Sequence, residues 1–492
     1  MNIIRAGLYH RGIEVRFLLY KRGMYMDIGN ELFIDITHMF ENSWSVKRED
    51  LEVYRNQIHR AAEKVAFIRS SGKGPDGSSV LFPHLPYLLK ENLLISEEEK
   101  TCLLSLKEKA KEYDILISIG IGGSYLGNQA LFDLFCGPYW NEYTREERNG
   151  YPKVYFSGQN VDPVSLIDLS DSIRKEAKRA GRKLKVLLLV ISKSGTTIET
   201  VSAIRGLKQL LKESCEIELM AVTDKEKGRI RPRAQREHFY CFTVPDGIGG
   251  RFSVFSQVGL VFASMLGIDI YQFLAGAQMV EEACQSEDME KNSALMLAVL
   301  KFIAMKEYGI AAEIIMPYGD KLRSLGWWYA QLLGESLGKK YDVDGNIVYN
   351  GRIPVASVGT TDMHSLTQEH QQGKKNKIIQ FVSVRHLPKD LEVKCDEDEE
   401  EGLVPMSRML AAARRANEEA LASEGRMSCH IAMNALTPFH AGAYMYFCFL
   451  AVAYEGALAN INTYDQPGVE AYKKILHKDL KNYIKSQKGT VK

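Results

Sequence analysis

The chain has 492 residues, of which 45% are apolar and 25% charged, with 63 Lys and Arg against 62 Asp and Glu. This length accommodates roughly two to four domains of about 100–200 residues each. The composition is that of an ordinary globular protein and excludes disordered and collagen-like chains. A net charge of +1 argues against a surface built to bind nucleic-acid backbones.

Residues 1–45 carry no usable motif and scatter charged residues where a signal peptide needs an apolar core, so we expect no leader. The most apolar segment, His440–Tyr454, is shorter than the roughly 18–20 residues that span a bilayer. We therefore predict a buried helix there and no membrane contact. Eight cysteines without a CxxC motif or a Cys/His cluster make zinc sites and disulfides improbable. We expect no metal and a reducing, cytoplasmic setting.

From residue 114 onward, short apolar runs alternate with amphipathic segments of helical period. The runs that suit strands buried on both faces are Asp114–Ile119, Lys153–Ser157, Lys185–Ile191, Glu216–Thr223 and Phe239–Val244. The rhythm restarts with candidate strands Ala312–Met316, Ile353–Val358, Lys377–Val384 and Arg426–Met433, and with candidate helices Leu403–Leu421 and Pro438–Leu458. Strands alternating with helices predict an α/β fold with doubly wound parallel sheets.

These patterns predict two α/β subdomains with an arm at each end of the chain. The boundaries we expect are 1–45 for the N-terminal arm, 46–270 and 271–460 for the two subdomains, and 461–492 for the C-terminal tail. The acidic run Asp396–Glu401 is interpreted as a solvated loop before a helix. A basic group is interpreted as solvated surface and not as a nucleic-acid site: Arg229, Arg231, Arg233 and Arg236.

Two loops that follow predicted strands have the chemistry of a phosphate site. Ser118–Gly127 (SIGIGGSYLG) places glycine amides and the Ser124 hydroxyl after the first strand. Ser192–Thr197 (SKSGTT) gathers four hydroxyls around one glycine at a helix start, where capping needs only one. Tyr125 occupies the sixth position of G-x-G-x-x-G, which argues against a dinucleotide fold, and neither loop reads as a Walker A motif.

Four further segments carry side chains that could take part in catalysis, although each one alone is also compatible with an ordinary surface or packing role. Arg251 follows two glycines at a strand end, where a guanidinium can stabilise an oxyanion. Gln331 and Glu335 lie four residues apart on a predicted helix, in an apolar stretch that would desolvate the carboxylate of a general base. His364 follows a predicted strand, and Thr463–Lys474 contains a turn and then a helix.

Taken together, these segments resemble the glucose-6-phosphate isomerase (phosphoglucose isomerase) family over nearly the whole chain. Asp246–Gly259 (DGIGGRFSVFSQVG) and Tyr464–Lys473 (YDQPGVEAYK) are similar to the two signature segments of the family. GIGGS, SKSGTT, GES-x-GK and the downstream His364 occur in the family's order. The resemblance implies two sugar-isomerase (SIS) subdomains of the flavodoxin-like αβα type, in agreement with the patterns above.

The resemblance also implies roles for individual residues in the interconversion of glucose 6-phosphate and fructose 6-phosphate. Glu335 would carry a proton between C1 and C2 through a cis-enediol, and Arg251 would stabilise the enediolate. His364 and Lys473 would open and close the sugar ring, the histidine reaching in from the second subunit of a homodimer. The residues expected to bind substrate are Gly123, Ser124, Ser192, Lys193, Ser194, Thr197, Gln331 and Gln466, with Lys193 contributing mainly its backbone. Such chemistry needs no cofactor.

The sequence departs from the family pattern in GTTDMHS, which lacks a Gln-His pair, so His370 is a competitor for the role of His364. A relative with wider tolerance, a phosphoglucose/phosphomannose isomerase, is the second enzyme hypothesis, and the full signature pair argues against it. A non-catalytic sugar-phosphate sensor with an SIS module is the hypothesis from another class. It would leave the retention of Glu335, Arg251, His364 and Lys473 unexplained.

Overall fold

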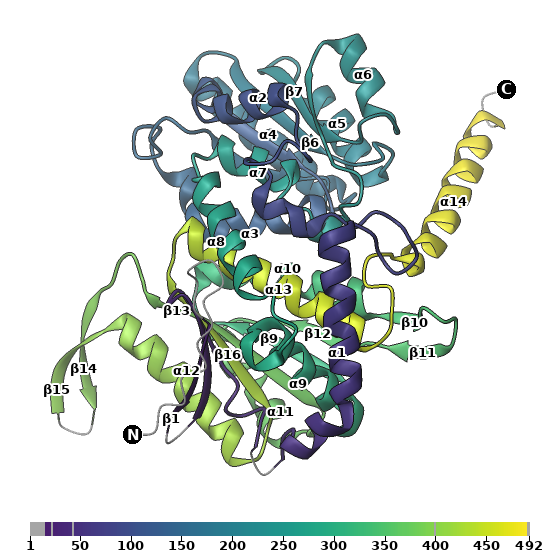
Figure 1. Cartoon of the computed structure of the whole chain (residues 1–492). Coiled ribbons are helices and arrows are strands. Elements are labelled where there is room, and N and C mark those ends of the chain that lie inside the picture. Colours follow the sequence, from purple (N-terminus) through teal and green to yellow (C-terminus); the bar gives the residue numbers. More distant parts are fainter. Residues whose placement is uncertain (1–14, 21–22, 42–43, 398–399, 490–492) are drawn as a thin grey trace.

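The computed structural model describes residues 15–20, 23–41, 44–397 and 400–489, which form two αβα units (Figure 1). The first unit contains a five-stranded parallel sheet in the order β5-β4-β6-β7-β8. Its strands are β4 (Ile115–Ile119), β5 (Lys153–Ser157), β6 (Leu184–Ile191), β7 (Cys215–Thr223) and β8 (Tyr240–Thr243). In chain order this is 2-1-3-4-5, the flavodoxin-like arrangement. The expected fold class of parallel αβα units is confirmed.

Both faces of this sheet are covered by helices, as the continuous apolar strands predict. Ile117 and Leu188 belong to a core cluster completed by helices α4 (Pro163–Ala180) and α5 (Ile198–Leu211). The alternate residues Leu116 and Leu187 point to the opposite face and join the main core of the molecule. The other helices of this unit are α2 (Glu97–Lys109), α3 (Leu126–Phe135), α6 (Ile230–Glu237) and α7 (Gln257–Met265).

The second unit is a seven-stranded sheet in the order β1-β2-β3-β16-β13-β9-β12. Its parallel strands are β9 (Ala312–Pro317), β12 (Ile353–Ala356), β13 (Lys377–His386) and β16 (Ser428–Ala435). The antiparallel strands β1 (Val15–Tyr20), β2 (Gly23–Ile28) and β3 (Leu32–Asp35) extend this sheet beyond β16. Residues expected to form an N-terminal arm therefore lie in the second sheet, because β3 pairs with a strand about 400 residues later in the sequence.

Helix α13 (Pro438–Leu458) runs through the middle of the molecule (Figure 1). It is long and apolar enough to cross a membrane, yet 94% of its most apolar window is buried inside the protein. It packs against α1 (Arg48–Ser71), α8 (Ile270–Ala283), α9 (Ser293–Glu307) and α10 (Arg323–Leu337). The crossing with α8 is close, because a Cβ on Gly276 would lie 1.8 Å from the Phe439 carbonyl oxygen. The expected buried helix is confirmed.

Buried ion pairs join α9, β9 and α13 within the second unit. Glu313 on β9 accepts from Lys301 on α9 at 2.6 Å and from Arg352 at 2.7 Å, and Arg352 also pairs with Glu455 on α13. Burial alone would raise the pKa of Glu313, but the adjacent Lys301 and Arg352 lower it to about 2. The carboxylate therefore stays ionised, and every described charge of this cluster has a partner.

Two hairpins and one helix project from the two units. The prediction of a solvated loop for the acidic run is wrong, because β14 (Glu392–Glu397) and β15 (Glu400–Pro405) form a hairpin there; residues 398–399 lie outside the described residues. Helix α12 (Met406–Ser423) follows it. The smaller elements are the hairpin β10 (Lys339–Tyr341) and β11 (Ile347–Asn350), and α11 (Thr367–Gln372). Helix α14 (Glu470–Gly489) stands away from the body (Figure 1).

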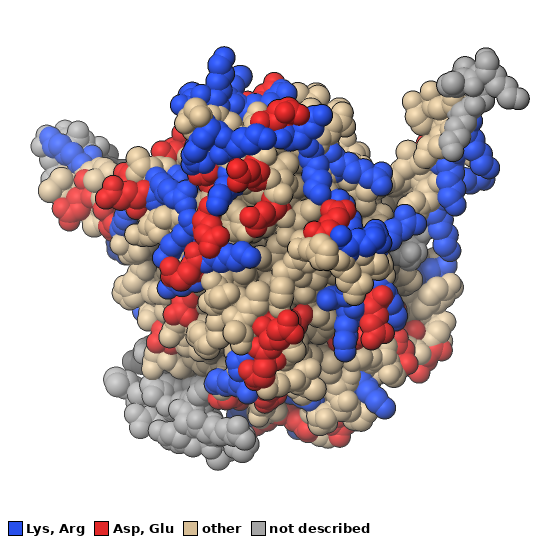
Figure 2. All heavy atoms as spheres, turned by 90° about the horizontal axis from the view of Figure 1, so that it is seen from above, with Lys and Arg blue, Asp and Glu red and all other residues tan. Residues whose placement is uncertain are grey.

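Basic and acidic side chains are interspersed on the face shown in Figure 2, without a continuous basic surface over the body. Two of the four arginines on and before α6 are engaged locally. Arg233 donates to Glu237 at 2.6 Å, and Arg231 donates to the Asp224 carbonyl oxygen at 3.0 Å. These two arginines are therefore bound into their own unit.

Candidate active site

The two predicted phosphate loops follow neighbouring strands of the first sheet. The chain leaves β4 toward β5 on one side and returns to β6 on the other, so the strand order reverses between β4 and β6. Ligands in open α/β sheets bind outside the carboxyl ends of the strands at such a point. The loop after β4 carries Gly123 and Ser124, and the loop after β6 carries Ser192–Thr197. Both loops lie at this edge because the strands are parallel.

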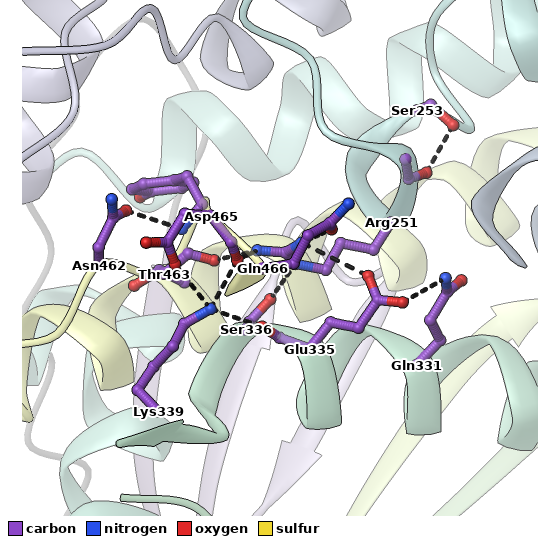
Figure 3. A network of polar contacts seen from close by, with 12 residues as sticks. Arg251, Ser253, Gln331, Glu335, Ser336, Lys339, Asn462, Thr463, Asp465 and Gln466 are labelled. Carbon is purple, nitrogen blue, oxygen red and sulfur yellow. Dashed lines mark hydrogen bonds and ion pairs between the residues drawn. The ribbon is translucent and has the colours of Figure 1, made fainter. Parts of the chain in front are cut away.

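The glycines after β4 permit a close approach to the segment that carries Arg251. Gly122 has φ +58°, and a Cβ at Gly123 would lie 1.9 Å from the Gly250 carbonyl oxygen. The hydroxyl of Ser253 donates to the Gly250 carbonyl oxygen at 2.6 Å (Figure 3) and contacts the Gly123 carbonyl oxygen at 3.3 Å. The backbones of the two segments are thus in direct contact, and this contact fixes the position of Arg251 relative to the first phosphate loop.

In the loop after β6, some hydroxyl groups make hydrogen bonds within the loop and others remain available to a ligand. Ser192 is buried and its hydroxyl accepts from the Gly195 amide at 3.1 Å, while Gly195 has φ +64°. Ser194 accepts from the Thr196 hydroxyl at 3.0 Å. Thr197 is the N-cap residue of α5 but makes no side-chain capping bond. With the exposed Lys193 and Ser194, the half-buried Thr197 hydroxyl lies at a helix start suited to an anion.

Arg251 is the centre of the polar network drawn in Figure 3. Its side chain is fully buried, and its Nε donates to Ser336 Oγ at 2.7 Å. Its Nη1 donates to Gln466 Oε1 at 2.8 Å and faces Glu335 Oε2 at 3.4 Å, while Nη2 donates to the Thr463 and Asp465 carbonyl oxygens. Burial lowers the pKa of the guanidinium, and Glu335 and Asp465 oppose that effect. The group remains charged because the ordinary pKa of arginine is so high.

Glu335 and Gln331 lie on one face of α10, as their spacing predicts. Gln331 Nε2 donates to Glu335 Oε1 at 2.9 Å, and the same amide would lie 3.0 Å from a Cβ on Gly122. The side chain of Glu335 is 28% exposed, so it lies between the buried guanidinium and solvent. One oxygen thus faces a cation and the other an amide (Figure 3), an arrangement suited to a base with a neighbouring oxyanion stabiliser.

Lys339 joins the same network, and sequence reasoning missed it. Its Nζ donates to the Glu335 carbonyl oxygen at 2.8 Å and to the Asp465 carbonyl oxygen at 2.6 Å, and it pairs with Asp465 Oδ1 at 3.0 Å. Its side chain is only 5% exposed. In the sequence, Lys339 closes GESLGK and has the signature of an ordinary lysine at a helix end. The signal that could have found it is its place four residues after Glu335.

The two residues expected to open the sugar ring belong to other segments, the short helix η8 (Thr361–His364) and helix α14. His364 is exposed at the end of η8 and, within the described part of the chain, donates to none of the network residues. Lys473 lies in the first turns of α14, which leads away from the body (Figure 1). The competitor His370 is buried, and burial lowers the pKa of its imidazole. A single chain therefore assembles the base, the cation and the phosphate loops, while the exposed His364 makes no hydrogen bond to them among the described residues.

A pocket of about 240 Å³ opens beside the Arg251 segment. It is lined by Lys193 from the second phosphate loop, by Gly247–Gly249 and by Tyr464 and Asp465. Among the described residues, no group of three His, Cys, Asp or Glu side chains is arranged to hold a metal ion.

The comparisons with known proteins agree with this site. The family model described as phosphoglucose isomerase matches residues 106–490. The chain is 32% identical over 454 residues to a glucose-6-phosphate isomerase of Carboxydothermus hydrogenoformans, covering 90% of this chain and 93% of that protein. It is 34% identical to the Clostridioides difficile glucose-6-phosphate isomerase, covering 77% and 83%. The crystal structure of the Chlamydia trachomatis glucose-6-phosphate isomerase has the same fold, with a TM-score of 0.76, 22% identity and coverage of 92% and 89%.

A doubly wound αβα protein with two loops suited to an anion at a topological switch point, next to a buried arginine and a helix-borne glutamate, has an architecture suited to a sugar-phosphate enzyme. The matched range and the level of identity make the assignment specific. This chain belongs to the phosphoglucose isomerase family.

Proposed function

We propose that this protein interconverts glucose 6-phosphate and fructose 6-phosphate. The observation that carries the proposal is the convergence of Arg251, Glu335 and Gln466 beside the loops after β4 and β6, in a chain of this family. The relatives named above are glucose-6-phosphate isomerases, and one of them matches over 90% of this chain. Isomerisation at C1 and C2 needs a proton carrier and an oxyanion stabiliser, and this site offers one of each.

In this proposal the two loops hold the phosphate. Hydroxyl groups come from Ser192, Ser194 and Thr197. The main chain at Gly123 and Lys193 lets the phosphate approach the backbone closely. Ser124 adds a hydroxyl from the loop after β4. The phosphate lies remote from C1 and C2, so its binding energy serves to position the reacting carbons.

Glu335 removes the proton from C2 of the open-chain aldose and returns it to C1, so that the intermediate is a cis-enediol. As the C2–H bond breaks, its electron pair enters the C1–C2 double bond and the carbonyl oxygen O1 becomes negative. The proton of the C2 hydroxyl passes to O1, and the return of the carried proton to C1 then leaves the C2 carbonyl of the ketose. Arg251 stabilises that oxygen, and its charge is already desolvated and fixed by four partners in the resting site. Gln331 and Gln466 orient the carboxylate and the guanidinium.

We further propose that the working unit is a cytoplasmic homodimer. His364 and Lys473 open and close the ring, and His364 reaches the network from the neighbouring subunit. The support is that His364 is exposed and makes no hydrogen bond to Glu335 among the described residues of its own chain. The exposed apolar residues Tyr472, Ile475 and Ile484 on α14 also suit an interface. The described cysteines are free thiols, as a reducing compartment favours.

An assay of purified protein tests the activity and the role of Glu335. Fructose 6-phosphate is supplied, and glucose 6-phosphate is measured with a dehydrogenase couple. We expect turnover by the wild type and a loss of about 10³-fold or more in kcat for Glu335→Gln, since the amide cannot accept the proton. Glu213→Gln, at a carboxylate that is 84% exposed, is the matched control.

Absence of turnover in the wild type would overturn the proposed activity. Turnover like that of the wild type in Glu335→Gln would overturn only the role of the glutamate. Mannose 6-phosphate in the same assay, with fructose 6-phosphate as product, distinguishes the isomerase with wider tolerance.

A further inference from the structure

The ammonium group of Lys339 has three N–H donors, and each has a partner in the structure. The partners are the Glu335 carbonyl oxygen at 2.8 Å, the Asp465 carbonyl oxygen at 2.6 Å and Asp465 Oδ1 at 3.0 Å. The side chain is 5% exposed, so this charge is held by the protein and not by water. Burying an unpaired ammonium group costs free energy. A buried lysine whose three donors all have partners therefore holds a defined position between the segments that it contacts.

Lys339 joins the helix that carries Glu335 to the 463–466 segment, which supplies hydrogen-bond acceptors to Arg251. Helix α10 ends at Leu337, so the carbonyl of Glu335 lies in its last turn, where intrahelical partners run out and a cation is favourable. Asp465 immediately precedes Gln466, whose side chain accepts from Arg251. Figure 3 shows Lys339 between these segments.

Lys339 and Arg251 also share one acceptor. The carbonyl oxygen of Asp465 accepts from Lys339 Nζ at 2.6 Å and from Arg251 Nη2 at 3.0 Å. Lys339 thereby fixes one of the oxygens that orient the guanidinium, while the carboxylate of Glu335 points away from Lys339 toward Gln331 (Figure 3). The lysine thus touches the supports of both groups and not the reacting ends.

We infer that Lys339 is a positioning residue, which clamps the end of α10 to the 463–466 segment and so holds Glu335 and Arg251 at their working separation. The inference rests on the proposed isomerase function. Loss of the clamp displaces groups that must be aligned only for proton transfer.

Lys339→Met tests the inference, because methionine keeps much of the side-chain length and removes all three contacts. We expect kcat to fall about 30- to 100-fold with KM within about threefold of wild type, since binding by the phosphate loops is separate. The matched control is Lys340→Met, at the exposed neighbouring lysine in β10, which should retain wild-type kcat.

Ligand binding separates positioning from general support of the fold. Two open-chain ligands are titrated by calorimetry: sorbitol 6-phosphate, which lacks a developing charge, and a phosphorylated aldonate one carbon shorter than the substrate, whose carboxylate mimics the enediolate. In Lys339→Met we expect the aldonate affinity to fall roughly in proportion to kcat, with sorbitol 6-phosphate affinity within about threefold. Equal losses for both ligands, accompanied by a lower melting temperature, would overturn positioning in favour of a structural role.

Asp465→Asn provides a second variant that leaves Lys339 and both main-chain acceptors in place. It removes the carboxylate charge that pairs with Lys339 and that also lies near Arg251, and we expect kcat to fall about threefold to tenfold. In the double variant the loss should be smaller than the product of the two single losses, because the two changes share the Lys339–Asp465 contact.

A wild-type kcat in Asp465→Asn together with an unfolded Lys339→Met would overturn the inference, as would a wild-type kcat in Lys339→Met. Inactivity of the unmodified protein would instead overturn the proposed function.

Discussion

At the residue scale, Glu418 on α12 is a carboxyl group buried among other titratable side chains. Burial raises its pKa to about 7, and Arg414 on the same helix opposes that shift. The groups that face it from its surroundings are Glu419 on α12, Asp35 on β3, Tyr25 on β2 and Tyr318, which directly follows β9. Its folded pKa exceeds the ordinary value of 4.5, so the folded state holds an extra proton between about pH 4.5 and pH 7.

The stability that this proton provides is present below about pH 4.5 and is lost as the pH rises through about 7. We therefore predict that the free energy of unfolding of the wild type falls by an amount on the order of 2 kcal/mol between about pH 5 and about pH 8. The Glu418→Gln variant should lack this fall. Urea unfolding of both proteins at the two pH values measures the difference. A pH dependence identical to that of the wild type would contradict the prediction.

Side chains of the candidate site were predictable to different degrees. Arg251, Glu335, Gln331 and Gln466 lie in motifs whose residue types suit the chemistry, and the structure places them in one network. Lys339 was missed, because its polar partner Asp465 lies more than a hundred residues away and only its spacing from Glu335 points to the site. The contact of His364 with the site stays a prediction, since its expected position belongs to a second copy of the chain.

At the element scale, the contact between Gly123 and Gly250 sets how the loop after β4 meets the segment of Arg251. An added Cβ at Gly123 would lie 1.9 Å from one backbone oxygen and 2.1 Å from the adjoining carbon, and neither can rotate away as a side chain would. We predict that Gly123→Ala separates the two segments and lowers kcat/KM by about 10²-fold or more.

The assay above and a thermal melt measure this effect. Gly402→Ala is the control, because its added Cβ has no atom within 4 Å, and it should leave kcat/KM and the melting temperature unchanged. An unaltered kcat/KM in Gly123→Ala would show that the loop after β4 does not depend on this contact.

Elements with local patterns were predicted well, and elements defined by distant partners were not. The five strands of the first sheet follow from their apolar runs, because a strand buried on both faces is recognisable by itself. Strand β3 has only four residues, and its role depends on pairing with β16. The β14–β15 hairpin was interpreted as a loop, because an acidic run disfavours a strand in isolation.

At the scale of the whole molecule, the proposed dimer makes a prediction about mixed subunits. If the partner subunit's His364 completes the site, a dimer of one Glu335→Gln chain and one His364→Ala chain contains one intact site and one doubly altered site. Each variant alone should be nearly inactive. Unfolding and refolding them together in equal amounts should restore about a quarter of wild-type activity, since about half of the dimers are mixed.

The recovered activity is measured against each variant refolded alone at the same protein concentration. Failure of the mixture to exceed the separate variants, while wild type refolds to full activity, would place His364 outside the neighbouring site.

The central position of α13 has a consequence for synthesis on the ribosome. The first sheet is complete by Thr243, so its strands can pair while the rest of the chain is still being made. The surfaces of α1, α8, α9 and α10 that bury α13 have no partner until residues 438–458 emerge, near the end of translation. We therefore expect nascent chains that stop before α13 to expose these apolar surfaces and to require chaperone protection.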